Sequence, residues 1–166
     1  MSEKTTALEA VKIQARAVIP IVRALERELG KDRAHFIVGR AIAESHAEWQ
    51  AKAESTRNSH PRNNDIEEQY PIETEVVEDT DSTCAINMTR CGFAEYFRAI
   101  GAADVGALLT CGVDFATEPV LRPDWEFRRS QTIMGGASHC DFRWRLRGQD
   151  DSASDASRNV TQRRTN

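Results

Sequence analysis

Apolar residues recur every three or four positions through the first part of the chain, which is the spacing of one face of an amphipathic helix. This stripe consists of Leu8, Val11, Ala15, Val18, Val22, Leu25 and Leu29. Gly30 predicts the end of the helix, and Pro20 predicts a kink inside it. A second helix is predicted over about residues 33–53. We expect the two to form an antiparallel helical hairpin.

Alternation of apolar and polar residues replaces the helical period further along the chain and predicts strands. Residues 73–90 are predicted to form two strands joined near residues 79–82. Cys84, Ile86 and Met88 then lie on one face of the second strand. Cys84 is therefore expected in the core, where an unpaired cysteine behaves as a small apolar residue.

A second pair of strands is predicted near the end of the chain. The first covers about residues 126–134 and the second about residues 139–147, with a turn at Gly135 and Gly136 between them. In the last strand Cys140 belongs to the apolar face, because apolar and polar residues alternate from that position onward.

Two short helices are predicted between the pairs of strands, over about residues 92–100 and 103–110. The expected fold class is α+β, with the N-terminal helical hairpin and the short helices packed on a small antiparallel β-sheet. Residues 1–147 are expected to form a single domain, and the polar residues 148–166 a disordered tail. The polar stretch 55–70 is predicted to be a loop.

Composition and charge argue against several classes of protein and of binding partner. The chain has 166 residues, of which 29% are charged, and a net charge of -4, so nucleic acid and membranes are not expected partners. It has no apolar run of the ~18–20 residues that span a bilayer, and its N-terminus is charged and unlike a signal peptide. We expect a cytoplasmic protein, and the sequence leaves a homo-oligomer open.

Four cysteines in such a protein are expected to be thiols, metal ligands or catalytic groups rather than disulfides. Cys91 comes where a strand ends and a helix begins. Backbone N–H groups at that position, together with the neighbouring Arg90, predict a lowered thiol pKa. The structural alternative is a cysteine that only packs against the sheet.

Cys111 and Asp114 form a C-x-x-D pair that shares a helix face if the helix continues through Gly112. The carboxylate could then orient a proton relay to the thiol. An unrelated buried thiol and helix-end aspartate would give the same pattern. Cys140 follows His139, but neighbours on a strand face opposite ways, so these two are not predicted to be a catalytic pair.

The region from Met88 to Trp144 resembles the L-2-amino-thiazoline-4-carboxylic acid hydrolase family. Members of that family carry a cysteine before a short helix, a C-x-x-D and a closing G-x-x-x-C-x-F. The corresponding segments in this sequence are TRCGFAEYFRAIGA, LLTCGVDFA and RRSQTIMGGASHCDFRWR. The matching cysteines are Cys91, Cys111 and Cys140.

The resemblance implies a hydrolase that opens the ring of 2-amino-thiazoline-4-carboxylate to N-carbamoyl-cysteine, or acts on a related heterocycle, without a cofactor. Our hypothesis makes Cys111 the nucleophile and Asp114 the proton acceptor or orienter, with Cys140 or Cys91 beside them, and the cysteine roles are exchangeable. A small-molecule carboxylate substrate also needs a cationic anchor. The candidate anchors on the flanking elements are Arg90, Arg128 and Arg129.

Two other functions fit the same residues. Cys91, Cys111 and Cys140, with Asp114 or His139, would suit a thiophilic metal ion, although ligands from three separate elements would have to meet. A non-catalytic small-molecule-binding or regulatory module is the other alternative, because helices on one face of an antiparallel sheet also suit ligand binding.

Overall fold

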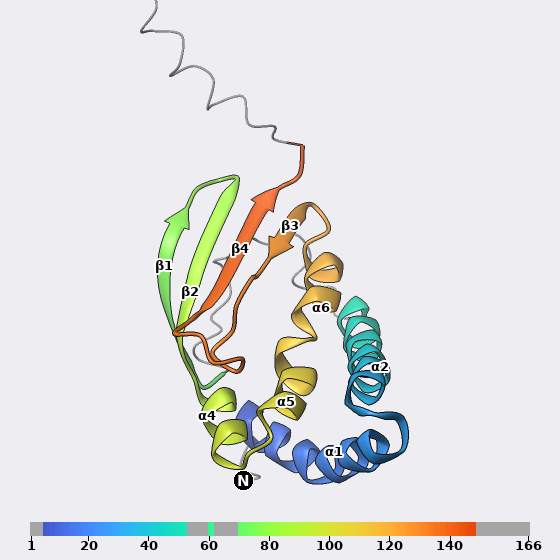
Figure 1. Ribbon diagram of the computed structural model, residues 1–166. Coiled ribbons are helices and arrows are strands. Elements are labelled where there is room, and N and C mark those ends of the chain that lie inside the picture. The colour runs from blue at the N-terminus through green and yellow to red at the C-terminus, as the bar shows by residue number, and fades with distance from the viewer. Residues whose placement is uncertain (1–4, 53–59, 62–69, 149–166) are drawn as a thin grey trace, which may run out of the picture.

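Helices pack against a four-stranded antiparallel sheet in the computed structural model, which describes residues 5–52, 60–61 and 70–148 (Figure 1). The helices are α1 (Ala7–Leu29), α2 (Lys31–Ala51), α4 (Gly92–Ala99), α5 (Ala103–Gly106), the π-helix η3 (Ala107–Cys111) and α6 (Asp114–Leu121). The strands are β1 (Ile72–Asp79), β2 (Thr83–Cys91), β3 (Trp125–Arg128) and β4 (Cys140–Leu146). The predicted α+β class is confirmed.

The N-terminal helices form a pair joined by one residue, as the sequence predicts. Gly30 separates them with φ +80, a left-handed value that glycine adopts without strain. Thr6 begins α1 with a reciprocal capping box, in which the Thr6 hydroxyl accepts from Glu9 N at 3.2 Å and the Glu9 carboxylate accepts from Thr6 N at 3.0 Å. The first helix runs on through Pro20. The second begins at Lys31, two residues before the predicted start.

The predicted faces of the central strands are confirmed by their pairing. Strands β2 and β4 lie side by side with the pairs Cys84↔Trp144, Ile86↔Phe142 and Met88↔Cys140. These apolar residues share one face because directly opposed residues in an antiparallel pair point the same way. Cys84 is almost fully buried and belongs to a core cluster with Ile86, Trp125 and Trp144.

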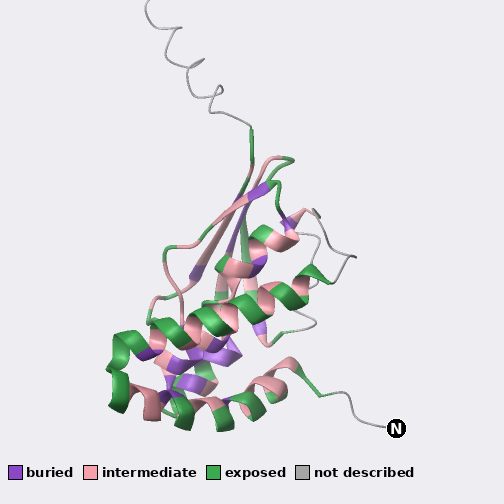
Figure 2. Cartoon of the chain, turned by 90° about the vertical axis from the view of Figure 1, so that its right-hand side faces the viewer, coloured by how far each residue is buried: buried purple, intermediate pink, exposed green. Residues whose placement is uncertain are grey.

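A second cluster of buried residues lies between the short helices and α1. Phe97 of α4 and Val105 of α5 have no exposed surface, and Ala15 and Val22 of α1 are equally buried. Figure 2 shows exposed positions along the outer faces of the two long helices and buried positions on the short helices behind them. The second long helix also packs on α6, the helix that follows the C-x-x-D pair.

The prediction of a strand over residues 126–134 is wrong in its extent, whereas the predicted turn at Gly135 and Gly136 is present, with Gly136 at φ +102. Strand β3 ends at Arg128, and residues 129–139 form a loop before β4. The backbone N–H groups of Ser130 and Gln131 donate to the side chain of Asp141, at 3.0 and 2.8 Å, instead of to a strand backbone. A carboxylate thus replaces the partners that would have extended the ladder.

Two predicted segments fall largely outside the described residues. They are the loop 55–70, of which residues 60, 61 and 70 are described, and the C-terminal tail from residue 149 onward. Within the described residues, every helix is too short or too polar to cross a membrane.

Gly106 permits the close approach of α5 and α4, and we predict that Gly106→Ala is destabilising. A Cβ at this position would lie 2.4 Å from Cγ of the fully buried Phe97, which is much shorter than a van der Waals contact between two carbon atoms. We expect the free energy of unfolding to fall by about 1–3 kcal/mol, as for other overpacked cores. Urea denaturation followed by circular dichroism measures this.

Gly39 of α2 is the matched control, because a Cβ there would meet only the tip of Leu108, at 3.2 Å. Gly39→Ala should change the free energy of unfolding by less than about 1 kcal/mol. Equal destabilisation by both substitutions would contradict the proposed packing of Gly106 on Phe97.

Candidate functional site

The C-x-x-D pair lies in a turn between two helices. The chain forms the π-helix η3 up to Cys111, and Gly112 N donates to Ala107 O at 2.7 Å, across five residues. Asp114 then begins α6. The two residues therefore do not share one continuous α-helix, and the geometry matches the terminal turn that Gly112 suggests. Single π-turns of this kind occur frequently at functional sites.

Arg129 connects both members of the pair. Its Nη1 donates to the Asp114 carboxylate and its Nη2 donates to the Cys111 carbonyl oxygen at 2.8 Å. The guanidinium also lies over two aromatic rings, 5.1 Å from the centre of Phe115 and 5.4 Å from that of Phe142. Only 6% of the Arg129 side chain is exposed. A buried cation thus holds the π-turn, α6 and the loop after β3 together.

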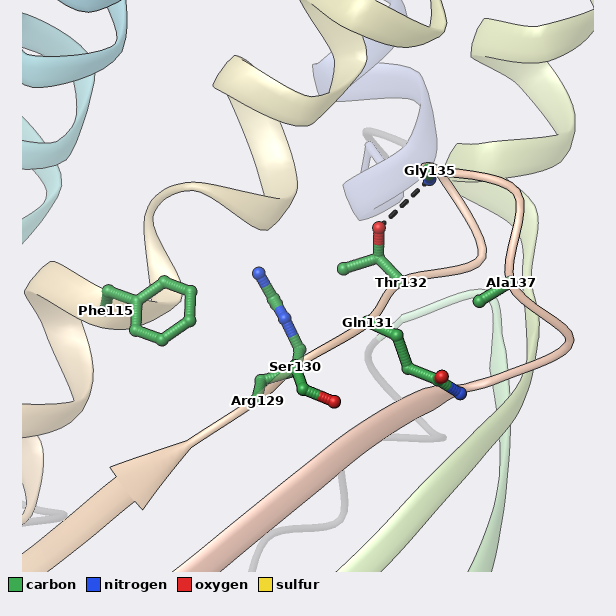
Figure 3. Close-up of a pocket in the computed structure, with 7 residues that line it drawn as sticks. All are labelled: Phe115, Arg129, Ser130, Gln131, Thr132, Gly135 and Ala137. Atoms are coloured by element: carbon green, nitrogen blue, oxygen red, sulfur yellow. Dashed lines mark hydrogen bonds between the residues drawn. The ribbon is translucent and has the colours of Figure 1, made fainter.

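A cavity of about 410 Å³ opens beside this arginine (Figure 3). Its walls come from the start of α6 and from the loop after β3. They are Phe115, Arg129, Ser130, Gln131, Thr132, Gly135 and Ala137. Figure 3 shows the Arg129 side chain extending along the space between Phe115 and Thr132. The cavity therefore offers an aromatic face, a cation and several neutral polar groups to a ligand.

Burial dominates the ionisation of the thiol at the turn. It raises the pKa of Cys111 to about 11, although the nearby Thr110 hydroxyl, 3.6 Å from Sγ, and the Arg129 charge oppose the rise. Cys111 is therefore a neutral thiol near pH 7. A nucleophilic role would require a base to remove its proton during the reaction.

Cys91 occupies the predicted place at the end of β2 and the start of α4, but the predicted lowering of its pKa is wrong. Burial raises the pKa of Cys91 and outweighs the opposing hydrogen bonds from the backbone of Ala94 and Phe93. The neighbouring Arg90 pairs instead with Glu95, at 2.8 Å. Sequence position indicated the hydrogen bonds correctly but not the burial.

Cys140 brings the final strand to the same region. Burial raises its pKa as well, against the opposing charge of Arg129. Its Sγ accepts from Ile133 N at 3.3 Å, and Ile133 packs against the hydrophobic cluster that includes Cys91 and contacts Cys111. The three cysteines singled out by the sequence thus lie at one hydrophobic cluster, and Asp114 is joined to Cys111 through Arg129. Their assigned roles stay predictions.

The ionisation of Asp114 is displaced toward neutral pH. Burial raises the pKa of its carboxyl to about 6, against the attraction of Arg129. Most Asp114 side chains are consequently ionised at pH 7 and protonated at pH 5. A carboxylate that titrates in this range is suited to accept and return protons.

The three arginines predicted as substrate anchors lie in different surroundings. Arg90 is half exposed and pairs with Glu95 and Glu73, and Arg128 is 77% exposed and pairs with Glu126 at 2.8 Å. Of the three, Arg129 lines the cavity. It is also the most constrained, because Asp114 and Cys111 already accept hydrogen bonds from it.

The cysteines do not form a metal-ligand group. Over the described ranges, the only cluster with closely spaced His, Cys, Asp or Glu ligand atoms is Glu26, His35 and Asp104, at the junction of α1, α2 and α5. Its carboxylates are paired with Arg23 and Lys31 at 2.7–2.8 Å. This cluster is therefore an ion-pair network that joins the three helices.

His139 makes its hydrogen bonds within the loop before β4. It is partly buried, its carbonyl oxygen accepts from Gln131 Nε2 at 3.1 Å, and its ring Nδ1 lies 3.0 Å from the Ser138 hydroxyl. Sequence reasoning missed the other polar residues of the cavity, Ser130, Gln131 and Thr132. They follow one another in a segment predicted to be a strand. The segment that resembles the family contains them, but its G-x-x-x-C-x-F motif begins only at Gly136.

Comparison with models of known protein families places the chain in one of them. The family described as L-2-amino-thiazoline-4-carboxylic acid hydrolase matches residues 10–144. The chain belongs to this family. The matched range includes the helical pair as well as all four candidate reactive residues, Cys91, Cys111, Asp114 and Cys140. The resemblance seen in three short motifs thus extends over most of the length of this chain.

Two further comparisons add little to the family assignment. No curated protein matches the chain. Among solved structures, it is similar to the phenol-responsive sensory domain of the transcription activator PoxR in complex with phenol, with 15% sequence identity and a TM-score of 0.47. That similarity covers 81% of this chain and 75% of the other, and it is too low to carry an argument about function.

We predict that Arg129→Met raises the pKa of Asp114 above its value of about 6, because the substitution removes the cation that favours the carboxylate. Titration of the Asp114 side-chain carbon by NMR measures this shift. Arg128→Met is the matched control, since that neighbouring side chain is exposed and pairs with Glu126. An unchanged pKa of Asp114 in Arg129→Met would show that the two side chains are not paired.

Proposed function

We propose that this family member is a hydrolase that opens a small ring at a carbon bonded to nitrogen and sulfur. The substrate class is 2-amino-thiazoline-4-carboxylate or a related cyclic amidine-like heterocycle. The observation that carries this proposal is the position of Arg129, which contacts Asp114 and Cys111 and also lines the cavity. The family to which the chain belongs supports the same chemistry.

The cavity suits a small, partly polar ring. Its volume of about 410 Å³ lies toward the lower end of the ~300–1,000 Å³ typical of ligand sites. Phe115 provides an aromatic face for a planar ring, and Ser130, Gln131 and Thr132 provide hydrogen-bonding groups around it. In this proposal the Arg129 N–H groups that do not bond Asp114 or Cys111 donate to a carboxylate of the substrate.

In the proposed reaction the Cys111 sulfur attacks the ring carbon between nitrogen and sulfur, and the thiol proton passes to Asp114. The carbon–sulfur bond of the ring then breaks, and the departing sulfur becomes a thiol by taking that proton. Water attacks the same carbon next and releases Cys111. One water molecule is consumed, and the product contains a free thiol and a urea-type group.

Asp114 can accept the proton in this scheme because it is ionised at a pH where Cys111 is still protonated. Transfer from the thiol to the weaker base is unfavourable on its own, so the proton leaves sulfur as the bond between sulfur and the ring carbon forms. Cys111 holds its proton at neutral pH, with a pKa of about 11, and Asp114 is mostly ionised there, with a pKa of about 6. Arg129 keeps the carboxylate beside the turn that carries the thiol. The same carboxylate could activate water directly, with Cys111 as a neighbouring group.

The absence of disulfides among the described cysteines supports a cytoplasmic location as part of this proposal. Cys84, Cys91, Cys111 and Cys140 form no disulfide. Cysteines that stay reduced are typical of reducing compartments.

A non-catalytic ligand-binding module would use the same cavity without turnover. Incubation with 2-amino-thiazoline-4-carboxylate and related cyclic amidines, followed by mass spectrometry, separates the two functions. Intact substrates throughout would overturn the hydrolase proposal.

Cys111→Ala is expected to lower turnover on the order of a thousandfold or more, because it removes the proposed nucleophile. Cys84→Ala is the control, since Cys84 packs in the sheet core with Ile86, Trp125 and Trp144 at 1% exposure, whereas Cys111 accepts a hydrogen bond from the cavity-lining Arg129. It should retain near-parental turnover per folded molecule. Steady-state kinetics on folded protein measures both, and equal activity of Cys111→Ala and the parent would refute the assignment.

The pH profile should follow Asp114. We expect kcat/KM to fall below about pH 6 as the carboxylate takes up a proton, reaching about one-tenth of its plateau at pH 5. Rates measured from pH 4.5 to 9 test this. A rate that keeps rising tenfold per pH unit up to pH 9 would instead indicate that ionisation of the Cys111 thiol controls the reaction.

A further inference from the structure

The loop after β3 leaves the sheet at a specific hydrogen-bonded contact. Strands β3 and β4 are paired as far as Arg128↔Arg143, so a continued ladder would place Ser130 opposite Asp141. These residues do meet, but through the side chain. The Asp141 carboxylate accepts from Ser130 N at 3.0 Å, from the Ser130 hydroxyl at 2.6 Å and from Gln131 N at 2.8 Å.

This contact forms one wall of the cavity. Ser130 and Gln131 both line the cavity directly after Arg129. The next part of the loop is held by a separate turn, in which Gly135 N and Ala137 N both donate to Thr132 O at 3.1 Å. Asp141 itself is not among the lining residues. It therefore acts on the cavity through the two residues that it binds.

We propose that Asp141 is a positioning residue for substrate binding, which holds the Ser130–Gln131 wall at the distance from Arg129 and Phe115 that the ligand requires. This inference rests on the proposed function for the identity of the ligand. The sequence supports a local role, because Asp141 stands between Cys140 and Phe142, whose ring packs on Arg129. The neighbouring residues Asp141 and Phe142 thus contact two parts of the cavity lining, the Ser130–Gln131 segment and Arg129.

The contact between Asp141 and the Ser130–Gln131 segment is expected to persist at neutral pH. Burial would raise the pKa of Asp141, but the hydrogen bonds from Ser130 and Gln131 outweigh it, so the pKa is lowered. The carboxylate is consequently ionised near neutral pH, and hydrogen bonds to an ionised acceptor are stronger than neutral ones. Neutral or shorter side chains at this position would release the loop.

The test compares Asp141→Ala, Asp141→Asn and Ser130→Ala in steady-state kinetics with the ring substrate. Asp141→Ala should raise KM about tenfold or more with kcat within about threefold of the parent, because the substitution weakens binding and leaves Cys111 and Asp114 in place. Asp141→Asn keeps one acceptor oxygen and should show a smaller rise. Ser130→Ala removes one of three hydrogen bonds and should show the smallest.

Glu126→Gln is the matched control, since it breaks an exposed ion pair with Arg128 on β3 without touching the loop. Its KM should equal that of the parent. A purely structural role of Asp141 would lower the folded fraction, and so kcat, with KM unchanged. That result would overturn the proposal.

Amide hydrogen exchange makes the test independent of turnover. Exchange at Ser130 and Gln131 should accelerate in Asp141→Ala while amides of β2 stay protected. Unchanged exchange overturns the proposal whatever the kinetics. If exchange accelerates but the parent opens none of the rings, the proposed function fails while the anchoring of the wall by Asp141 stands.

Discussion

A buried guanidinium is the constraint on which the site depends. An arginine removed from water is unfavourable unless its charge is paired and its N–H groups are satisfied. Arg129 meets this requirement only with groups from separate segments, namely Asp114, the Cys111 carbonyl and the rings of Phe115 and Phe142. The π-turn, the start of α6 and the last strand must therefore all be in place together. The candidate site therefore forms only when these segments of the fold have packed together.

Helix α6 is held by such polar contacts at its first residue and at its middle. Asp114 binds Arg129 at the start of the helix, and one turn later Glu118 accepts from Trp144 Nε1 at 2.8 Å. Glu118 also pairs with Arg122, which caps the helix and is 2% exposed. The contact with Trp144 anchors the helix to the aromatic face of the sheet. A helix anchored at two points keeps its first residue in a defined place, which a proton-transferring carboxylate requires.

Periodic features of this protein were predictable from sequence, and individual side-chain contacts were not. The stripe of α1 and the inward face of Cys84, Ile86 and Met88 follow from helical and strand periods, and both are confirmed. The early end of β3 has no such signal, because it depends on one carboxylate, Asp141, that replaces backbone partners. The burial that sets the ionisation of Cys91 and Cys111 depends on tertiary packing, which spacing does not encode.

The π-turn before Cys111 has a consequence for how the segment tolerates changes in length. A π-turn holds one more residue than an α-turn, so removal of one residue from η3 would allow a regular α-helix to form there. The bond from Gly112 N to Ala107 O would be lost, and the turn that leads from η3 to α6 would be rebuilt. The Cys111 carbonyl and the Asp114 carboxylate, which both accept from Arg129, would then shift relative to that guanidinium. Relatives that keep this site should therefore accept substitutions between Ala107 and Asp114 more readily than insertions or deletions.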